Sequence, residues 1–416
     1  MKSLYYNVNP IGWATTFWLK RFWKGAMFSK INGLSLRDVP KPDLPGDNWV
    51  ICKTLLGGIC GTDIGIITQK QPPDSILQEF SSMPMRLGHE NIAIVDQVGS
   101  SVDKSWIGKR VIADPTLCCE VRGITPICAP CQRGEFGACE NFGAKHADGS
   151  SKMGPGTSIG YCGEFGGSFS EYFPAHVSSL TELPADLSDE QAILTDPLAC
   201  SLHSVLRADL STCKRALVYG SGVLGLGVIA CLRAVGFTGE IHTLNRSRTT
   251  ETLAKEFGAD KFIVPHKGKA DRYKQIAGET DATVHRARFG NYMLSGGYDL
   301  VFDCVGTPSV FEDCLKFAAA RGQVVMVATA SKGNIDLTPL WFRELKIIGV
   351  FGRQIEHYNG EDIHTNSLVH KFMLAGKLNV SKMLTHTFPV MDYKKALNAA
   401  VFKSTSKSIK VAFDFR

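Results

Sequence analysis

The sequence of 416 residues contains no segment with the length and composition of a membrane-spanning helix. Such a helix needs ~20 consecutive apolar residues. The uncharged run 216–232 has only 17 residues, and its four glycines indicate a strand and a turn before a helix. No secretory leader is recognisable, because residues 1–9 are largely polar and Lys20, Arg21 and Lys24 interrupt the apolar run that follows. We therefore expect a cytoplasmic protein with no membrane as partner.

The sequence also lacks internal repeats and low-complexity tracts. Its net charge of +6 is modest and suits an anionic small ligand better than a nucleic acid, which would require a clustered basic face. Hydrophobic residues make up 44% and charged residues 21%, the balance of a globular protein. The length allows two domains of ordinary size.

Thirteen cysteines without a leader indicate a reducing compartment, in which clustered thiols bind metal instead of forming disulfides. Five of them fall within 22 residues: Cys118, Cys119, Cys128, Cys131 and Cys139. Four thiolates around Zn²⁺ would stabilise a loop that has little core of its own. The alternative is a redox pair at Cys128 and Cys131, but such pairs begin a helix after a strand, and these two lie among prolines and glycines. The sequence predicts a structural zinc held by Cys119, Cys128, Cys131 and Cys139, with Cys118 as the alternative to Cys119.

A second metal site is indicated between residues 57 and 90. Cys60 lies in the motif Gly57–Asp63 and His89 in the motif Leu87–Glu90, and their side chains are ligands that Zn²⁺ prefers. Thr62 places a hydroxyl two residues from the thiolate. Taken singly, Cys60 and His89 are more often core residues, so the prediction depends on a third ligand. Asp196, just before a proline in an apolar run, is either that ligand or a helix cap.

A glycine-rich motif predicts a dinucleotide site. The β-rich stretch from Arg215 leads into the sequence Gly220-Ser-Gly222-Val-Leu224-Gly225, and a helical stretch follows. This strand–turn–helix context is typical of the G-x-G-x-x-G fingerprint. Gly222 would let the backbone approach a pyrophosphate at the N-terminus of the helix.

The residues that follow the next strand indicate which nicotinamide cofactor is bound. An NAD site would have Asp or Glu there to hold the ribose hydroxyls. This sequence has Asn245-Arg246-Ser247-Arg248 instead, and the two arginines suit a 2′-phosphate. We therefore expect NADP(H); the alternative is a solvated basic loop.

Patterns of strands and helices divide the chain. Residues 34–111 combine short β-rich runs with proline and glycine turns, as in a small antiparallel barrel. Residues 160–187 look like further strands of this barrel, and strand and helix patterns alternate from Arg215 up to the run Leu345–Phe351. In residues 11–28 aromatic side chains recur at helical spacing, namely Trp13, Phe17, Trp18, Phe22 and Trp23, and we expect one helix there. Packing on the chain itself or on a second subunit is the favoured interpretation of this helix; a lid and a membrane-surface helix are the alternatives.

Together these motifs resemble the zinc-dependent medium-chain dehydrogenase/reductase superfamily, the relatives of alcohol, sorbitol and glucose dehydrogenases. The resemblance covers nearly the whole chain. It implies an α/β fold with a GroES-like β-barrel catalytic domain at 1–195, to which 353–416 returns. A Rossmann domain with a doubly wound parallel sheet is implied at 196–352.

The resemblance also implies roles for residues. Cys60, His89 and Asp196 would hold a catalytic zinc, with Glu90 as an exchangeable ligand or close neighbour of the metal. Val305 and Gly306 would lie beside the cofactor at the end of a Rossmann strand. The superfamily usually forms homodimers or homotetramers.

Two departures from the superfamily pattern affect the expected function. The position that usually supplies the first cysteine of the structural zinc loop is Thr125, so either the upstream Cys119 takes its place or the zinc site is weakened. The position that usually carries a proton-relay histidine is Gly65. We expect hydride transfer between NADP(H) and a small alcohol or carbonyl substrate, with Thr62 moving the proton. The alternatives are reduction of an iminium or activated alkene, and a nucleotide-binding protein without catalysis.

Overall fold

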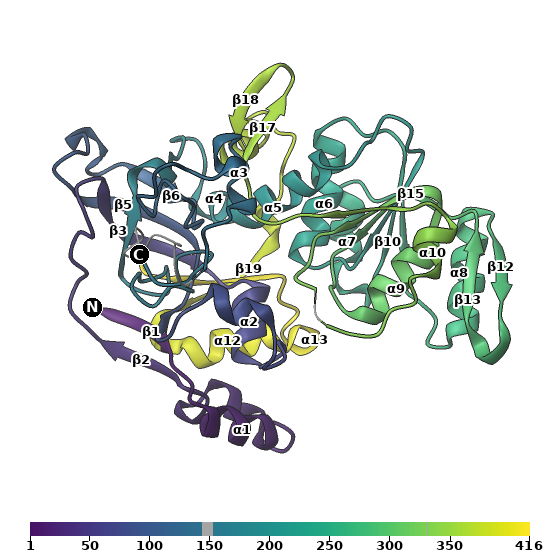
Figure 1. Cartoon of the computed structure of the whole chain (residues 1–416), viewed down its shortest axis with the longest axis horizontal. Coiled ribbons are helices and arrows are strands. Elements are labelled where there is room, and N and C mark those ends of the chain that lie inside the picture. The colour runs from purple at the N-terminus through teal and green to yellow at the C-terminus, as the bar shows by residue number, and fades with distance from the viewer. Residues whose placement is uncertain (144–152, 331) are drawn as a thin grey trace. The chain divides into compact units, whose positions relative to one another are not determined.

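The computed structural model describes residues 1–143, 153–330 and 332–416. The chain forms two compact units. Unit 1 comprises Met1–Asp196, Arg353–His370 and Ser381–Arg416, and unit 2 comprises Pro197–Gly352 and Lys371–Val380 (Figure 1). The expected domain boundaries return all of 353–416 to the first domain, whereas Lys371–Val380 belongs to unit 2.

Unit 1 is built on a seven-stranded sheet in the order β19-β20-β3-β5-β6-β8, with β7 paired to β3. The strands are β3 (Trp49–Gly58), β5 (Glu90–Val98), β6 (Arg110–Ala113), β7 (Tyr172–His176), β8 (Leu180–Glu182), β19 (Leu384–Pro389) and β20 (Lys410–Asp414). All pairs are antiparallel except β19 with β20. The C-terminal strand therefore pairs with β3 of the N-terminal half, which confirms the predicted barrel-type β-domain.

Smaller elements complete unit 1. The remaining strands are β1 (Lys2–Tyr6), β2 (Leu34–Asp38) and β4 (Met85–Arg86), in the order β2-β1-β4, and the hairpin β17 (Ile355–Tyr358) and β18 (Glu361–His364). The helices are α1 (Pro10–Leu19), α2 (Gly61–Ile67), α3 (Ala129–Gln132), α4 (Asp189–Ala192), α12 (Tyr393–Val401) and α13 (Lys403–Ser406). Two helices, α5 (Thr195–Leu206) and α11 (Thr365–Leu374), begin in unit 1 and end in unit 2.

The aromatic helix is shorter than predicted. Helix α1 ends at Leu19, and a turn leads to the short 3₁₀ helix η1 (Lys24–Phe28). The cause lies at Trp23 and Gly25: Trp23 is extended, and a Cβ at Gly25 would lie 2.6 Å from the Trp23 indole nitrogen. The indole therefore occupies the space that a helical side chain would need, and glycine is itself a poor helix former.

Unit 2 contains a parallel sheet in the order β11-β10-β9-β14-β15-β16. Its strands are β9 (Arg215–Tyr219), β10 (Glu240–Leu244), β11 (Lys261–Ile263), β14 (Tyr298–Asp303), β15 (Ala318–Met326) and β16 (Lys346–Gly349). The chain thus starts in the middle of the sheet and winds outward in both directions, which confirms the predicted doubly wound Rossmann sheet.

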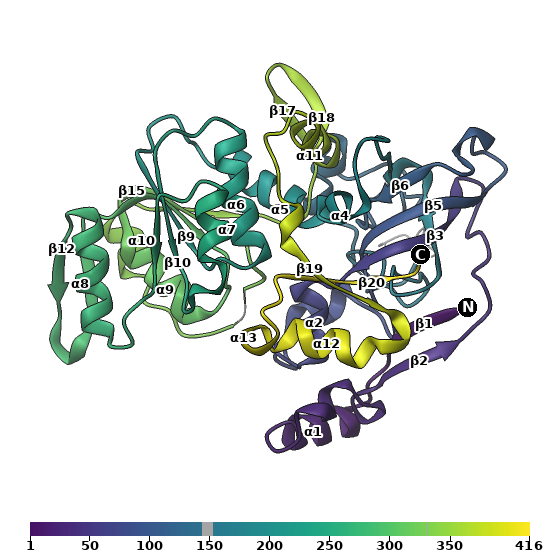
Figure 2. The same ribbon diagram turned by 180° about the vertical axis from the view of Figure 1, so that it is seen from behind.

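The helices of unit 2 follow its strands. They are α6 (Val223–Ala234), α7 (Glu251–Glu256), α8 (Lys269–Thr280), α9 (Pro308–Phe317) and α10 (Thr338–Phe342). Right-handed crossovers place α6 and α7 on one face and α9 and α10 on the other (Figures 1 and 2). An antiparallel hairpin, β12 (Thr283–Arg286) and β13 (Tyr292–Ser295), is inserted before β14. Within the ranges described above, no helix has the length and apolarity to cross a membrane.

Candidate metal centres and cofactor site

Three neighbouring strands of unit 1 each have one terminus at the same edge of the sheet. Strand β3 ends at Gly58, and its antiparallel neighbours β5 and β20 begin at Glu90 and Lys410. Cys60 follows β3 by two residues, and His89 directly precedes β5. The sheet topology therefore brings together side chains that lie up to 350 residues apart in the sequence.

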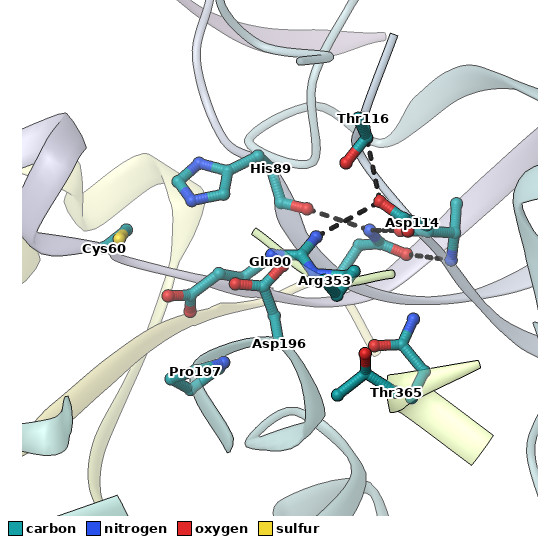
Figure 3. A network of polar contacts seen from close by, with 12 residues as sticks. Cys60, His89, Glu90, Asp114, Thr116, Asp196, Pro197, Arg353 and Thr365 are labelled. Carbon is teal, nitrogen blue, oxygen red and sulfur yellow. Dashed lines mark hydrogen bonds and ion pairs between the residues drawn. The ribbon is translucent and has the colours of Figure 1, made fainter. Parts of the chain in front are cut away.

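The candidate catalytic metal site consists of Cys60, His89 and Glu90. One ligand atom from each lies within 4.8 Å of the others (Figure 3). Burial disfavours a charged His89, but the negative charges of Cys60 and Asp63 outweigh burial and raise the pKa of His89 to about 10. A metal ion would displace this extra proton from His89 Nε2, and one thiolate, one imidazole and one carboxylate suit Zn²⁺.

His89 is oriented by a tyrosine. The Tyr161 hydroxyl donates to Asp63 Oδ1 at 2.9 Å, and its oxygen lies 3.0 Å from His89 Nδ1. Since the hydroxyl proton is used on Asp63, His89 Nδ1–H is the donor to Tyr161, which leaves the Nε2 lone pair for a metal. Asp63 also accepts from the backbone N–H of Cys60 at 2.9 Å, so one carboxylate is linked to both ligands.

Glu90 has a fixed counter-ion. Its carboxylate is ion-paired with Lys410, and both side chains are almost fully buried. Burial alone would lower the pKa of Lys410, but the charge of Glu90 outweighs it, so that the Lys410 pKa is raised and the lysine stays protonated. A Cβ at Gly58 would collide with the Glu90 carboxylate, so only glycine fits opposite it in the sheet.

Asp196 lies near this group but has a different partner. It is the second residue of α5, and its carboxylate pairs with Arg353 at 2.9 Å. Arg353 also pairs with Asp114 at 3.3 Å (Figure 3). His364 Nε2 lies 3.0 Å from the other oxygen of Asp114. Asp196 is not part of the set of close ligand atoms, so its role as a ligand stays a prediction.

Two further positions bear on proton transfer. Thr62 Oγ1 lies 3.7 Å from Cys60 Sγ, in the first turn of α2. Gly65 is buried in the same helix, and a Cβ there would meet nothing within 4 Å. The place of the usual relay histidine is therefore open space.

The second candidate metal site consists of Cys119, Cys128, Cys131 and Cys139, the four residues selected from the sequence. Their sulfur atoms lie within 4.8 Å of one another, and Cys118 is not among them. Cys119 Sγ and Cys139 Sγ are 3.7 Å apart. A tetrahedron with Zn–S bonds of about 2.3 Å has edges of about 3.8 Å, so this spacing fits zinc.

The thiolates of this site have hydrogen-bond donors. Cys119 Sγ accepts from the Asn141 side-chain amide at 3.0 Å and from the backbone N–H of Cys128 at 3.4 Å. Cys139 Sγ accepts from the backbone N–H of Asn141 at 3.4 Å. Burial raises the pKa of Cys139 to about 12, and a bound cation would reverse this effect.

The glycine-rich loop of unit 2 is shaped to admit a phosphate group. A Cβ at Gly225 would collide with the backbone of Gly220, so the loop closes tightly onto α6. A Cβ at Gly222, the N-cap of α6, would meet nothing within 4 Å, which leaves room at the helix N-terminus. A Cβ at Gly220 would lie 2.6 Å from Val305 Cγ2, so the predicted residue Val305 borders the loop.

The remaining cofactor residues lie in loops at the ends of β10 and β14. Asn245, Arg246 and Arg248 directly follow β10, and both arginines are exposed. Arg248 pairs with Glu251 at 2.6 Å. The N–H groups of Val305 and Gly306 donate to Asp303, each at 2.9 Å, which holds the turn after β14. Leu224 lies in the first turn of α6.

Four residues of the unit 1 site are not predicted from the sequence: Tyr161, Lys410, Arg353 and Asp114. Only Lys410 has a weak sequence signal of its role, because a lysine inside an apolar terminal β-run is stable only with a buried partner of opposite charge. The others lie in segments without a local pattern.

Comparisons with known proteins show the family of the chain. Residues 46–185 match the family model of the alcohol dehydrogenase GroES-like domain, and residues 223–365 match that of the zinc-binding dehydrogenase. The chain is 27% identical to an L-idonate 5-dehydrogenase of Vitis vinifera over 86% of this chain and 85% of that one. It is also 27% identical to an L-threonine 3-dehydrogenase of Chromobacterium violaceum, over 92% and 97% of the two chains.

Solved structures share the fold. A 2R,3R-butanediol dehydrogenase of Bacillus subtilis aligns with a TM-score of 0.69 at 24% identity, covering 92% of this chain and 96% of that one. A protein of Sinorhizobium meliloti 1021, described as a zinc-binding dehydrogenase bound to NADP, aligns with the same score, identity and coverage. With both halves matched and the metal and nucleotide motifs in place, the chain belongs to the zinc-dependent medium-chain dehydrogenase/reductase superfamily.

Proposed function

We propose that the protein transfers a hydride between NADP(H) and an alcohol or carbonyl substrate. The observation that carries the proposal is the meeting of Cys60, His89 and Glu90 at one end of the sheet, with the His89 Nε2 lone pair left for a metal. A protein that had lost catalysis would have no need to keep this set.

Different residues of unit 1 would bind the metal and transfer the proton. Cys60 and His89 would hold a catalytic zinc, with Glu90 or Asp196 as an oxygen donor. When bound, zinc supplies a Lewis acid that lowers the pKa of a substrate hydroxyl or polarises a carbonyl. Thr62 would accept the proton of the substrate hydroxyl and pass it on. Because Gly65 has no side chain, the proton must then continue through water or a ribose hydroxyl.

We infer NADP(H) as the cofactor, since it would supply or accept the hydride and its 2′-phosphate has basic partners in this chain. No Asp or Glu stands among residues 245–248, where a carboxylate would repel that phosphate. Arg246 and Arg248 are exposed there and offer planar, charged donors.

The substrate class we propose is a secondary alcohol with a polar neighbouring group, or the corresponding ketone. The names of the two curated relatives specify oxidation at carbon 5 of L-idonate and at carbon 3 of L-threonine. Each of these carbons carries a secondary hydroxyl beside another polar group.

The test is a substrate screen with a paired metal-site variant. Purified protein is assayed with NADPH and NADH against polyols, sugar acids, amino alcohols and their ketones. We expect turnover of at least one member with NADPH, loss of that turnover in Cys60→Ser, and normal turnover in Cys213→Ser, a half-buried cysteine of unit 2. Equal activity of Cys60→Ser and wild type would contradict the proposal.

A second candidate reaction, reduction of an iminium or activated alkene, is favoured by Gly65, since neither reduction creates an alkoxide at this spot. The open space beside Gly65 makes Gly65→His a direct test. If the protein oxidises alcohols, we expect Gly65→His to raise the rate of alcohol oxidation several-fold below neutral pH. An unchanged alcohol rate together with native iminium reduction would favour the second candidate.

A further inference from the structure

The aromatic segment at the start of the chain presents large apolar side chains outward. Ile11, Phe17, Trp18, Phe22 and Trp23 have exposed fractions of 79, 41, 58, 78 and 52%. These five residues are here called the aromatic surface. Both views show α1 at the edge of unit 1, beyond β2 (Figures 1 and 2). The centres of the Trp18 and Phe22 rings lie 5.4 Å apart, and several large exposed apolar side chains gathered in one short segment mark an interaction site.

Hydrogen bonds and burial fix one side of α1 against unit 1, so the other side of the helix faces solvent in a defined orientation. The side chain of Asn9 caps the helix by accepting from the backbone N–H of Gly12 at 2.7 Å. The Trp13 carbonyl accepts from Gln69 Nε2 at 2.8 Å, and Thr16 is fully buried. The segment therefore binds the rest of unit 1 by one side only.

The segment that carries the aromatic surface has charged side chains of one sign, although Lys2 at its start is paired with Asp38 at 2.6 Å. Residues 1–37 contain six of the 46 Lys and Arg side chains and none of the 40 Asp and Glu side chains. The other residues carry 40 of each sign, so the net charge of +6 lies entirely in this segment. Lys20 Nζ and the Arg21 guanidinium lie 4.6 and 5.6 Å from the centre of the Phe17 ring, so cations and aromatic rings share one surface.

This combination discriminates between partners. A two-fold contact between two copies would set two basic segments without acidic residues against each other, and like charges oppose such a contact. An anionic bilayer has the complementary charge. Its headgroup region favours tryptophan and phenylalanine beside lysine and arginine.

We propose that the aromatic surface docks the protein onto anionic lipid membranes. Trp18, Phe22 and Trp23 enter the headgroup region, and Arg21 and Lys24 lie at the lipid phosphates. This revises the expectation that the segment packs within the protein and that no membrane is a partner. It is independent of the proposed reaction.

The experiment is co-sedimentation of the full chain with vesicles of phosphatidylcholine alone or with phosphatidylserine. One variant, W18S/F22S/W23S, removes the apolar part of the surface. A second, R21Q/K24Q/K30Q, removes charge and leaves the apolar part intact. The control is Phe289→Ser, a fully exposed phenylalanine in the β12–β13 hairpin beside Arg288. Zinc content and NADPH binding show that each variant is folded.

We expect at least tenfold more binding to phosphatidylserine vesicles than to phosphatidylcholine vesicles, and a decrease with added salt. Each triple variant should lose at least tenfold, and Phe289→Ser should bind like wild type. Absence of wild-type binding, or full binding by R21Q/K24Q/K30Q, would overturn the proposal. So would light scattering that shows a halved mass for W18S/F22S/W23S without vesicle binding by wild type, since the surface would then join two copies.

Discussion

Tyr161 Oη lies 3.0 Å from His89 Nδ1, and its own proton is donated to Asp63. This contact decides which ring nitrogen of His89 faces the candidate metal. It therefore links a residue outside the predicted ligand set to the affinity of the site.

Tyr161→Phe should weaken zinc binding at the Cys60 site by roughly 10- to 100-fold, the usual effect of losing a partner behind a metal ligand. Asp63 Oδ1 is 3.8 Å from His89 Nδ1 and cannot replace the hydroxyl at that distance. Chelator competition measures the affinity. Tyr172→Phe, in β7, is the matched control and should leave it unchanged. An affinity equal to wild type in Tyr161→Phe would show that His89 does not depend on this contact.

Cys128→Ser should remove one zinc per chain and lower the unfolding temperature, because the metal stabilises a loop with little core. Cys118→Ser should keep the full metal content, since Cys118 is not among the four close sulfur atoms. Metal analysis and thermal unfolding of both variants provide the measurement. Loss of zinc in Cys118→Ser, with retention in Cys128→Ser, would assign the site differently.

Arg246→Ala and Arg248→Ala should each weaken NADPH binding by about tenfold or more, since a charge-assisted hydrogen bond contributes about 1.5–3 kcal/mol. NADH binding should change little, because NADH has no 2′-phosphate. Titrations with both nucleotides give the ratio. Lys255→Ala, on the neighbouring helix and paired with the same Glu251, is the control. If the variants lose affinity for NADH and NADPH equally, the loop at residues 245–248 does not bind the 2′-phosphate.

The Asp114 carboxylate should stabilise the fold at neutral pH and lose this effect in acid. Burial would raise the pKa of Asp114, but Arg353 and His364 outweigh it and hold this pKa well below its ordinary value. A carboxyl group with a lowered pKa in the folded state stabilises above the unfolded pKa of about 3.9 and loses this effect as the pH falls through the folded value. Asp114→Asn should therefore cost roughly 3 kcal/mol near neutral pH, and progressively less below about pH 4. Denaturant unfolding across this range would reveal a pH-independent cost if the ion pair were unimportant.

The parts of the site that could be predicted from the sequence are those in which spacing alone carries chemistry. Cys60, His89 and the cysteine loop fall in short motifs, and the glycines of unit 2 lie between a clear strand and a clear helix. The alternation of strands and helices was likewise sufficient to predict the Rossmann sheet.

The residues behind the ligands could not be predicted, because long-range pairing places them. Lys410 meets Glu90 only because β20 and β5 flank β3, which pairs residues 320 apart in the sequence. Arg353 pairs with Asp114 across 239 residues, from an irregular segment before β17 that has no periodic pattern. The early end of α1 depends on where the Trp23 indole packs, which helical spacing does not encode.

The central claim is that Cys60 and His89 hold a metal for hydride transfer. It is tested most directly by metal content per chain for wild type and Cys60→Ala, together with NADPH binding. The account predicts two zinc ions in wild type and one in Cys60→Ala, with NADPH binding retained because the nucleotide motifs lie in unit 2. The same zinc content in both proteins would contradict it, since Cys60 would then hold no metal.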